Sequence, residues 1–176
     1  MVRRIRYAVA ASLDGYIAGP KGEAEWIIFD PKIDFAKVFK EFDTVLLGRN
    51  TFEAMAQSGK RTMPGMQTFV FSRTLRQRDY PEVTILGDQA EEKLATLRRE
   101  PGKDIWLMGG GALFRSLLEA GFVDTVEVSV VPVLLGAGIP LLPPPASEAK
   151  LELIRHTAYG TGIVCLQYAV KSGSDS

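Results

Sequence analysis

Short, almost continuously apolar runs alternate along this chain with segments of helical hydrophobic spacing, and this alternation limits the folds that are open to it. The runs are Ile5–Ala11, Thr44–Gly48, Thr68–Ser72, Val83–Leu86 and Ile105–Met108. Strands that are apolar on both sides are typical of parallel sheets, because the helices of βαβ units cover both faces of such sheets. The pattern therefore predicts an α/β fold built around a mainly parallel sheet.

Amphipathic helices are expected between these runs. Phe35, Val38, Phe39 and Phe42 follow the i, i+3, i+4, i+7 spacing of one apolar stripe, which predicts a helix with that stripe buried. A second apolar face over Leu113–Leu118 predicts a helix that begins directly after three glycines. These helices would connect successive strands and pack on the sheet.

The pattern changes after Val123, where the strands become one-sided. Glu127 and Ser129 alternate with valines, as in a strand with one wetter face. The segments LELIRHT and GIVCLQYAV, separated by AYGT, predict a closing antiparallel hairpin. The expected fold is thus a mostly parallel sheet of about eight strands with a C-terminal antiparallel hairpin and helices on both faces. We expect one domain over residues 1–171 and a disordered tail over residues 172–176.

Composition excludes several classes of protein. Twenty-one basic residues balance twenty-one acidic ones, and no basic stripe indicates nucleic-acid binding. The apolar segment Val126–Pro145 contains a glutamate and a proline-rich end, which argues against a membrane span. Cys165 is the only cysteine, so no internal disulfide forms and a cytoplasmic location is expected. No spacing of His, Cys and carboxylates indicates a metal site.

Three of the expected strands end in residues that suit a phosphate group. These ends are Gly48–Thr51, Ser72–Thr74 and Gly109–Gly111, and helices follow the first and the last. Glycines let a backbone approach a pyrophosphate, and the N-terminus of a helix offers free N–H groups and a positive dipole end. Arginines can add bidentate bonds to a further phosphate, so Arg49 and Arg73 favour NADPH over NADH. The alternative is a tight turn with two surface charges.

A conventional dinucleotide fingerprint is absent, because no G-x-G-x-x-G follows the first strand. The chain instead resembles the dihydrofolate reductase superfamily, in the branch of the C-terminal reductase domain of bacterial riboflavin-biosynthesis deaminase/reductases. The matching segments are AASLDGYIAG, LLGRNTFE, VFSRTL, IWLMGGGALFRSLLEAGFVDTVEVSVVPVLLG and the closing hairpin. The resemblance implies a three-layer, dihydrofolate reductase-like fold with NADPH across the strand ends.

The resemblance also implies which residues hold NADPH. They are Ala10 and Ile17 at the nicotinamide, Gly48, Arg49, Asn50 and Thr51 at a phosphate-contacting turn, Ser72, Arg73 and Thr74 at the adenosine-ribose phosphate, and Met108, Gly109, Gly110, Gly111, Ala112 and Leu113 along the cofactor. Gly109 and Gly110 correspond to a cis Gly–Gly pair. Ala112 stands where the family can carry an arginine, which leaves the preference for NADPH to Arg49 and Arg73.

The substrate side is less defined. Asp34 is the candidate for the buried acid that dihydrofolate reduction requires, and a helix N-cap is the alternative role for this residue. Asp30 is a second candidate acid. Trp26, Phe35 and Phe52 are expected to line a flat pocket, although Phe35 and Phe52 are equally compatible with the core. Asp14 with Gly15 is expected to shape a turn.

The expected activity is that of an NADPH-dependent oxidoreductase, which transfers a hydride to a small heterocycle resembling a pterin or an aminopyrimidine. By resemblance, the reaction is similar to that of 5-amino-6-(5-phosphoribosylamino)uracil reductase domains or of dihydrofolate reductase. Met108 stands where the riboflavin-type reductases tend to carry a glutamate, so the substrate stays open. The alternative is a non-catalytic NADP- or nucleotide-binding module. The resemblance and the apolar segment 126–142 also suggest a homodimer.

Overall fold

The computed structural model describes residues 1–173, so residues 174–176 of the predicted tail lie outside the described residues. The regular elements, in chain order, are β1 (Ile5–Ser12), β2 (Tyr16–Ala18), α1 (Phe35–Phe39), β3 (Phe42–Gly48), α2 (Arg49–Gln57), β4 (Gln67–Phe71), the 3₁₀ turn η1 (Gln77–Asp79), β5 (Thr84–Leu86), α3 (Ala90–Arg99), β6 (Asp104–Gly109), α4 (Gly111–Glu119), β7 (Thr125–Val131), β8 (Ile139–Pro140), β9 (Leu151–Ala158) and β10 (Val164–Val170).

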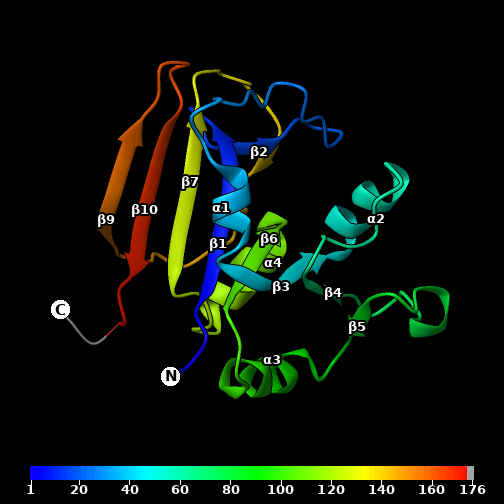
Figure 1. The fold of residues 1–176 in the computed structure, drawn as a ribbon. Coiled ribbons are helices and arrows are strands. Elements are labelled where there is room, and N and C mark those ends of the chain that lie inside the picture. The colour runs from blue at the N-terminus through cyan, green and yellow to red at the C-terminus, as the bar shows by residue number, and fades with distance from the viewer. Residues whose placement is uncertain (174–176) are drawn as a thin grey trace.

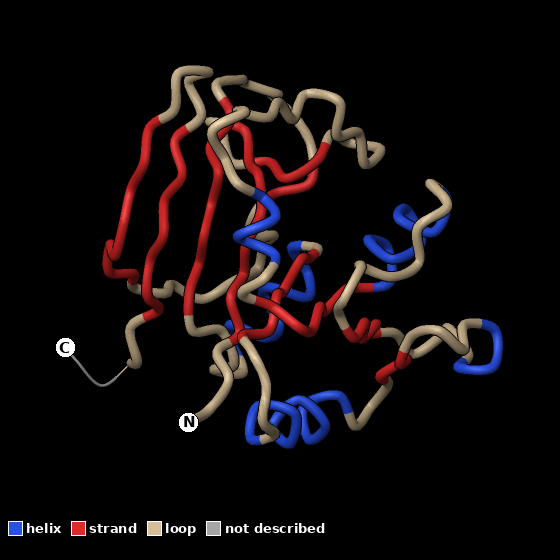
Figure 2. The backbone as a smooth tube through the Cα atoms, in the orientation of Figure 1, coloured by secondary structure: helices blue, strands red, loops and turns tan. Residues whose placement is uncertain are grey.

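Eight of the strands form one twisted sheet in the order β5-β4-β3-β6-β1-β7-β10-β9 (Figure 1). Every pairing from β5 to β7 is parallel, and β10 pairs antiparallel with both β7 and β9. The predicted α/β class, the eight strands and the antiparallel C-terminal pair are therefore confirmed. The short strands β2 and β8 form a separate antiparallel pair that the sequence did not predict, and this pair lies beside the upper end of β1 (Figure 2).

Successive side chains of each strand point to opposite faces of the sheet, so each strand contributes to two separate cores. Ile5 and Tyr7 of β1 belong to a core shared with α3 and α4, in which the Tyr7 and Phe114 rings stack at 3.8 Å between centroids. On the opposite face a smaller core surrounds Phe52 of α2 and covers β3 and β4. Helices thus lie on both faces. On the second face, however, the core beneath α2 covers only β3 and β4.

The helix predicted over Phe35–Phe42 is wrong in its length and in its burial. α1 ends at Phe39, and Phe42 is instead the first residue of β3, where its side chain is buried. Phe35 and Val38 are partly exposed, and α1 buries none of its residues. The apolar spacing was real, but its residues face a cavity rather than a packed core. No helix within residues 1–173 is both long enough and apolar enough to cross a membrane.

Candidate active site

The turns after β3 and β6 bring two helix N-termini together. Gly48 is the N-cap of α2 and Gly110 is the N-cap of α4. A Cβ atom on Gly48 would lie 3.5 Å from the backbone nitrogen of Gly110, and one on Gly110 would lie 3.4 Å from the hydroxyl of Thr51. The first N–H groups of each helix have no acceptor within their own helix. Two sets of free donors and two positive dipole ends therefore point to one place.

Gly111 lies on the other side of this turn, where a distant segment of the chain packs against it. A Cβ at Gly111 would lie only 2.7 Å from the carbonyl oxygen of Pro140 and 2.9 Å from Cδ of Pro143. The segment around β8 therefore passes too close to α4 for any side chain at this position. The Gly109–Gly110 peptide is cis, as the resemblance implied.

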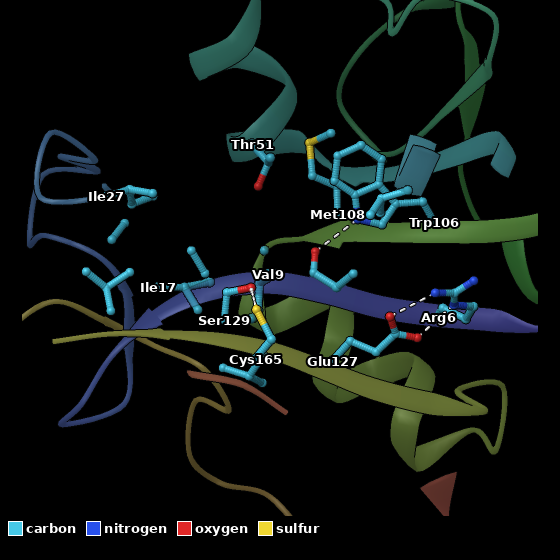
Figure 3. Close-up of a pocket in the computed structure, with 18 of the residues that line it drawn as sticks. Arg6, Val9, Ile17, Ile27, Thr51, Trp106, Met108, Glu127, Ser129 and Cys165 are labelled. Carbon is cyan, nitrogen blue, oxygen red and sulfur yellow. Dashed lines mark hydrogen bonds and ion pairs between the residues drawn. The ribbon is translucent and has the colours of Figure 1, made fainter. Parts of the chain in front are cut away.

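A large cavity of about 1480 Å³ extends from these two N-termini across the less covered face of the sheet. Most of the predicted cofactor residues line it, namely Ala10, Ile17, Gly48, Arg49, Asn50, Thr51, Met108, Gly110, Gly111, Ala112 and Leu113. Figure 3 shows Ile17 and Thr51 beside the empty space that Met108 borders. The sequence motifs of three separate segments thus meet at one end of one cavity.

The residues predicted after β4 lie outside the lining of this cavity. Ser72 accepts hydrogen bonds from the backbone nitrogens of Thr74 and Leu75 at 3.2 and 3.0 Å, which shapes the turn. Arg73 is exposed and pairs with Asp88 at 3.0 Å. Because Phe71 of β4 is paired with Gly48 of β3, this turn still lies on the strand next to the α2 N-terminus.

The floor of the cavity is polar, which the sequence reasoning missed. Arg6 is buried and donates to both carboxylate oxygens of Glu127, at 2.7 and 2.9 Å, and it also bonds Glu41 at 2.5 Å and Asp104 at 3.2 Å. Burial opposes the charge of Arg6, but the bonds to Glu127 and Glu41 outweigh it and raise the pKa of the guanidinium. Gln167 donates to the same Glu127 at 3.2 Å.

Ser129 and Cys165 continue this floor towards the cofactor end. The Ser129 hydroxyl and the Cys165 thiol are 3.2 Å apart on neighbouring strands, and Figure 3 shows them beside Val9 and Ile17. Cys165 is half-buried and borders the cavity. The alternation of Glu127 and Ser129 with valines was the available signal. This alternation correctly predicted a strand with one more polar face. It could not show that the polar face forms the floor of a cavity.

Aromatic rings form one wall of the cavity in an unbroken series. Successive ring centroids are 5.6 Å apart for Phe29 and Phe35, 6.2 Å for Phe35 and Phe39, and 5.4 Å for Phe39 and Trp106. The Trp106 indole is fixed by a 2.9 Å bond from its Nε1 to the carbonyl oxygen of Ala8. The cavity therefore has a polar floor and an aromatic wall, which suits a flat ring with polar groups on one edge.

Two of the three predicted substrate-pocket residues are elsewhere. Phe35 lines the cavity, but Phe52 is fully buried in the core beneath α2, where its ring contacts Tyr80 edge-on. Trp26 lies outside the cavity lining and donates to the carbonyl oxygen of Glu23 at 3.0 Å. The neighbouring Ile27 takes the position that was expected for Trp26.

Both candidate acids have structural roles. The exposed Asp34 carboxylate accepts from the backbone nitrogen of Lys37 at 2.9 Å and caps α1, outside the cavity lining. The buried acid predicted at this position is therefore not found there. Asp30 is buried but accepts bonds from Lys32 and Thr161, which tie the loop to the β9–β10 turn and lower the pKa of Asp30. Asp14 holds its turn, as expected, through bonds from Ser12, Leu135 and Gly136.

Solved structures with the same fold include a riboflavin-biosynthesis protein and a dihydrofolate reductase. The chain matches a putative riboflavin biosynthesis protein from Shewanella sp. PV-4 with a TM-score of 0.80 and 25% identity, over 98% of this chain and all of that one. It also matches dihydrofolate reductase from Enterococcus faecalis complexed with NADP(H), with a TM-score of 0.72 and 20% identity, over 98% of this chain and all of that one. The fold and its cavity thus define a protein of the dihydrofolate reductase-like class.

Within that class the family is specific. The model of the RibD C-terminal domain matches residues 3–165, and the chain belongs to this family. It is 33% identical to the uncharacterized protein YyaP of Bacillus subtilis, over 94% of both chains. It is 25% identical to the riboflavin biosynthesis protein RibD of Corynebacterium ammoniagenes, over 93% of this chain and 51% of that protein. The chain is therefore a reductase-type domain related to riboflavin-pathway reductases.

Proposed function

We propose that this protein is an NADPH-dependent oxidoreductase that reduces a small, flat heterocycle resembling a pterin or an aminopyrimidine. The observation that carries the proposal is the convergence of the α2 and α4 N-termini, through Gly48 and Gly110, at one end of the cavity. A relative in fold, the Enterococcus faecalis dihydrofolate reductase, is complexed with NADP(H). The glycine turns leave the space and the N–H donors that a pyrophosphate requires.

The residues present fit NADPH, and each would hold one part of it. The first turns of α2 and α4 would hold the pyrophosphate, and Arg49 with the Ser72–Thr74 turn would hold the adenosine-ribose phosphate. Ala10 and Ile17 would lie along the nicotinamide, where small and apolar side chains leave room for a ring. When bound, NADPH supplies the hydride.

The remaining part of the cavity would bind and orient the ring to be reduced. Its aromatic wall can stack on one face of the ring, and Ser129 and Gln167 can bond polar groups on its edge. Holding donor and acceptor in one geometry is a large part of catalysis in such reactions.

The experiment is a titration of NADPH and NADH against the wild-type protein and the variants Arg49→Ala and Arg73→Ala. We expect both variants to weaken NADPH binding much more than NADH binding, because only NADPH carries the additional phosphate. Arg78→Ala is the control, since Arg78 is exposed, as Arg73 is, and pairs with Asp79 outside the cavity lining. An equal loss for both cofactors would refute the phosphate assignment.

The second candidate function is a non-catalytic NADP-binding module. Two observations favour it: Asp34 caps a helix, and Glu127 is already bound by Arg6. NADPH oxidation against dihydrofolate, other pterins and phosphoribosylaminopyrimidines separates the two candidates. Tight NADPH binding with no turnover of any of them would favour the module.

We also propose that the protein is a homodimer, but through a different surface from the one the sequence indicated. Val126 and Val131 of the apolar segment are buried inside the subunit, because β7 lies between β1 and β10. The edge strand β9 instead exposes Leu151 and Leu153, and exposed apolar edge strands favour association.

A further inference from the structure

Exposed apolar side chains gather at the mouth of the cavity. Isolated exposed hydrophobic residues are normal on a protein surface, but a contiguous group marks a binding site. Half of the large hydrophobic residues that are exposed in the described chain line this one cavity, namely Ile28, Phe29, Phe35, Val38, Ile139 and Ile154. The group is continuous with the interior, because the Phe29 ring contacts Phe35 and the series continues down to Trp106.

The charged residues of the cavity give a second, independent constraint on the chemistry of the substrate. A phosphate group on a substrate needs free cationic donors. Arg6 is already bound by Glu127, Glu41 and Asp104, and Arg4 is bound by Asp104. At the cofactor end, Arg49 pairs with Glu53 only in an exposed i,i+4 bridge, which contributes little and leaves the guanidinium available to the phosphate of the cofactor. Inside the cavity, away from the cofactor end, every cation is thus neutralised by a carboxylate.

Two further cations border the cavity, but both lie at its rim. Lys21 and Arg155 are exposed, and neither forms an ion pair with any residue between 1 and 173. Arg155 is on β9, opposite Gln167 of β10, so it is the unpaired cation that lies next to this floor. This makes Arg155 the decisive residue for the alternative of a phosphorylated substrate.

We infer that the substrate of this protein is a flat heterocycle that carries an apolar or aryl substituent and no phosphate. The inference rests on the proposed function, since it assigns the half of the cavity that NADPH would leave free. The ring lies over the polar floor of Ser129 and Gln167, and the substituent lies against Phe29, Phe35 and Ile154 at the mouth. Covering these side chains removes their apolar surface from water, which favours binding. The substrate class therefore differs from the phosphoribosylaminouracil named for a reductase of the same fold from Thermotoga maritima.

Three fluorescent probes with one common ring test this inference, namely pterin, 6-phenylpterin and the monophosphate of 6-hydroxymethylpterin. Their binding to the full-length protein is measured by fluorescence titration with NADP⁺ present. We expect 6-phenylpterin to bind about tenfold more tightly than pterin, a difference of about 1.4 kcal/mol. We expect the monophosphate to bind no more tightly than pterin. Tightest binding of the monophosphate, lost in Arg155→Ala, would overturn the inference.

Phe29→Ser separates the rim from the rest of the site. Phe29 and Leu134 are both 69% exposed, but only Phe29 lines the cavity, so Leu134→Ser is the matched control. Phe29→Ser should remove most of the advantage of 6-phenylpterin and leave pterin and NADPH binding unchanged, whereas Leu134→Ser should change none of them. An unchanged 6-phenylpterin affinity together with a loss of dimer in sedimentation would assign the rim to a second subunit and overturn the inference.

A titration of NADPH on the same samples distinguishes the two proposals. If NADPH binds but 6-phenylpterin shows no preference over pterin, the substrate class is wrong and the proposed function stands. If NADPH does not bind, the proposed function fails, whatever the order of the pterins. The probes therefore test the substrate half of the cavity, and NADPH tests the cofactor half.

Discussion

Arg6 contacts three carboxylates in the site, and these neighbours explain why a buried charge is stable there. Both oxygens of Glu127 accept from it, Glu41 and Asp104 complete the shell, and the guanidinium lies 4.6 Å above the Phe42 ring. A buried ion that loses its partner is costly, because its charge stays desolvated. The pair therefore fixes the floor of the cavity in one arrangement.

Removal of Arg6 should be strongly destabilising. Arg6→Ala leaves Glu127 without its cationic partner, so we expect the free energy of unfolding to fall by about 3–5 kcal/mol in urea denaturation. Arg4→Ala is the control, because Arg4 is exposed and its pair with Asp104 should contribute less than about 1 kcal/mol. A similar fall in the free energy of unfolding for the two variants would contradict the strong contribution of the buried Arg6 pair.

Asp14 should make stability depend on pH in the acidic range. Bonds from Ser12, Gly136 and Leu135 lower the pKa of Asp14 from 3.8 to about 2 in the folded protein. Its contribution is therefore fully present above pH 3.8 and is lost as the pH falls through 2. The difference in Tm between wild type and Asp14→Ala should be constant at pH 5–7 and should shrink towards pH 2. A difference that is independent of pH would exclude this role.

At the scale of the elements, the strands were predictable and the short connections were not. The apolar runs became β1, β3, β4, β5 and β6, in which most residues are at least partly buried. The apolar side of α1 was predicted to pack in the core, whereas it faces the cavity. Apolar spacing does not distinguish a packed core from the wall of a cavity. β2 and β8 are too short to leave a periodic signal in the sequence. Pro140 of β8 also packs closely against Gly111, which is far from β2 in the chain.

The two glycine turns should respond differently to alanine. A Cβ on Gly48 meets its neighbours at 3.5 Å or more, so Gly48→Ala should fold with a loss of no more than about 1 kcal/mol and should weaken NADPH binding. A Cβ on Gly111 meets the Pro140 backbone at 2.7 Å, so Gly111→Ala should lower Tm markedly. Thermal unfolding and NADPH titration measure the two effects. NADPH binding that is unaffected in Gly48→Ala would contradict the site.

The cap of α1 can be separated from catalysis. Asp34→Ala removes the bond to the Lys37 backbone, so we expect hydrogen exchange at this amide to accelerate about fivefold, which corresponds to about 1 kcal/mol. Asp34→Asn keeps an acceptor and should exchange more slowly than the alanine variant. Neither change should alter the turnover of any reduced substrate, and a loss of turnover in Asp34→Asn would restore the catalytic role.

At the scale of the whole molecule, the site could be predicted only in part from the sequence. The cofactor end depends on local strand-to-helix turns, so its residues appear as short motifs such as Gly48–Thr51 and Gly109–Leu113. The substrate half joins side chains from β1, β7, β9 and β10, which are up to about 160 positions apart in the chain. No local pattern could show that Arg6, Glu127 and Gln167 meet, because their contact depends on the order of the strands.

The proposed homodimer is tested at the exposed edge of the sheet. Leu153 is 50% exposed on β9, and a charge there would oppose the pairing of two apolar edges. We expect wild type to sediment as a dimer and Leu153→Lys as a monomer with an unchanged Tm. Leu13→Lys, at an exposed position outside β9, should leave the dimer intact. A wild-type protein that sediments as a monomer would refute the assembly.

The strand order of the sheet has a consequence for how such proteins diversify. The glycine turns follow β3 and β6, whereas the polar floor extends over β1, β7, β10 and β9. A substitution on the last three strands can therefore alter which compound is accepted without moving the turns that hold the reductant. One scaffold can thus acquire new reactions at one side of its sheet while the reducing chemistry stays the same at the other.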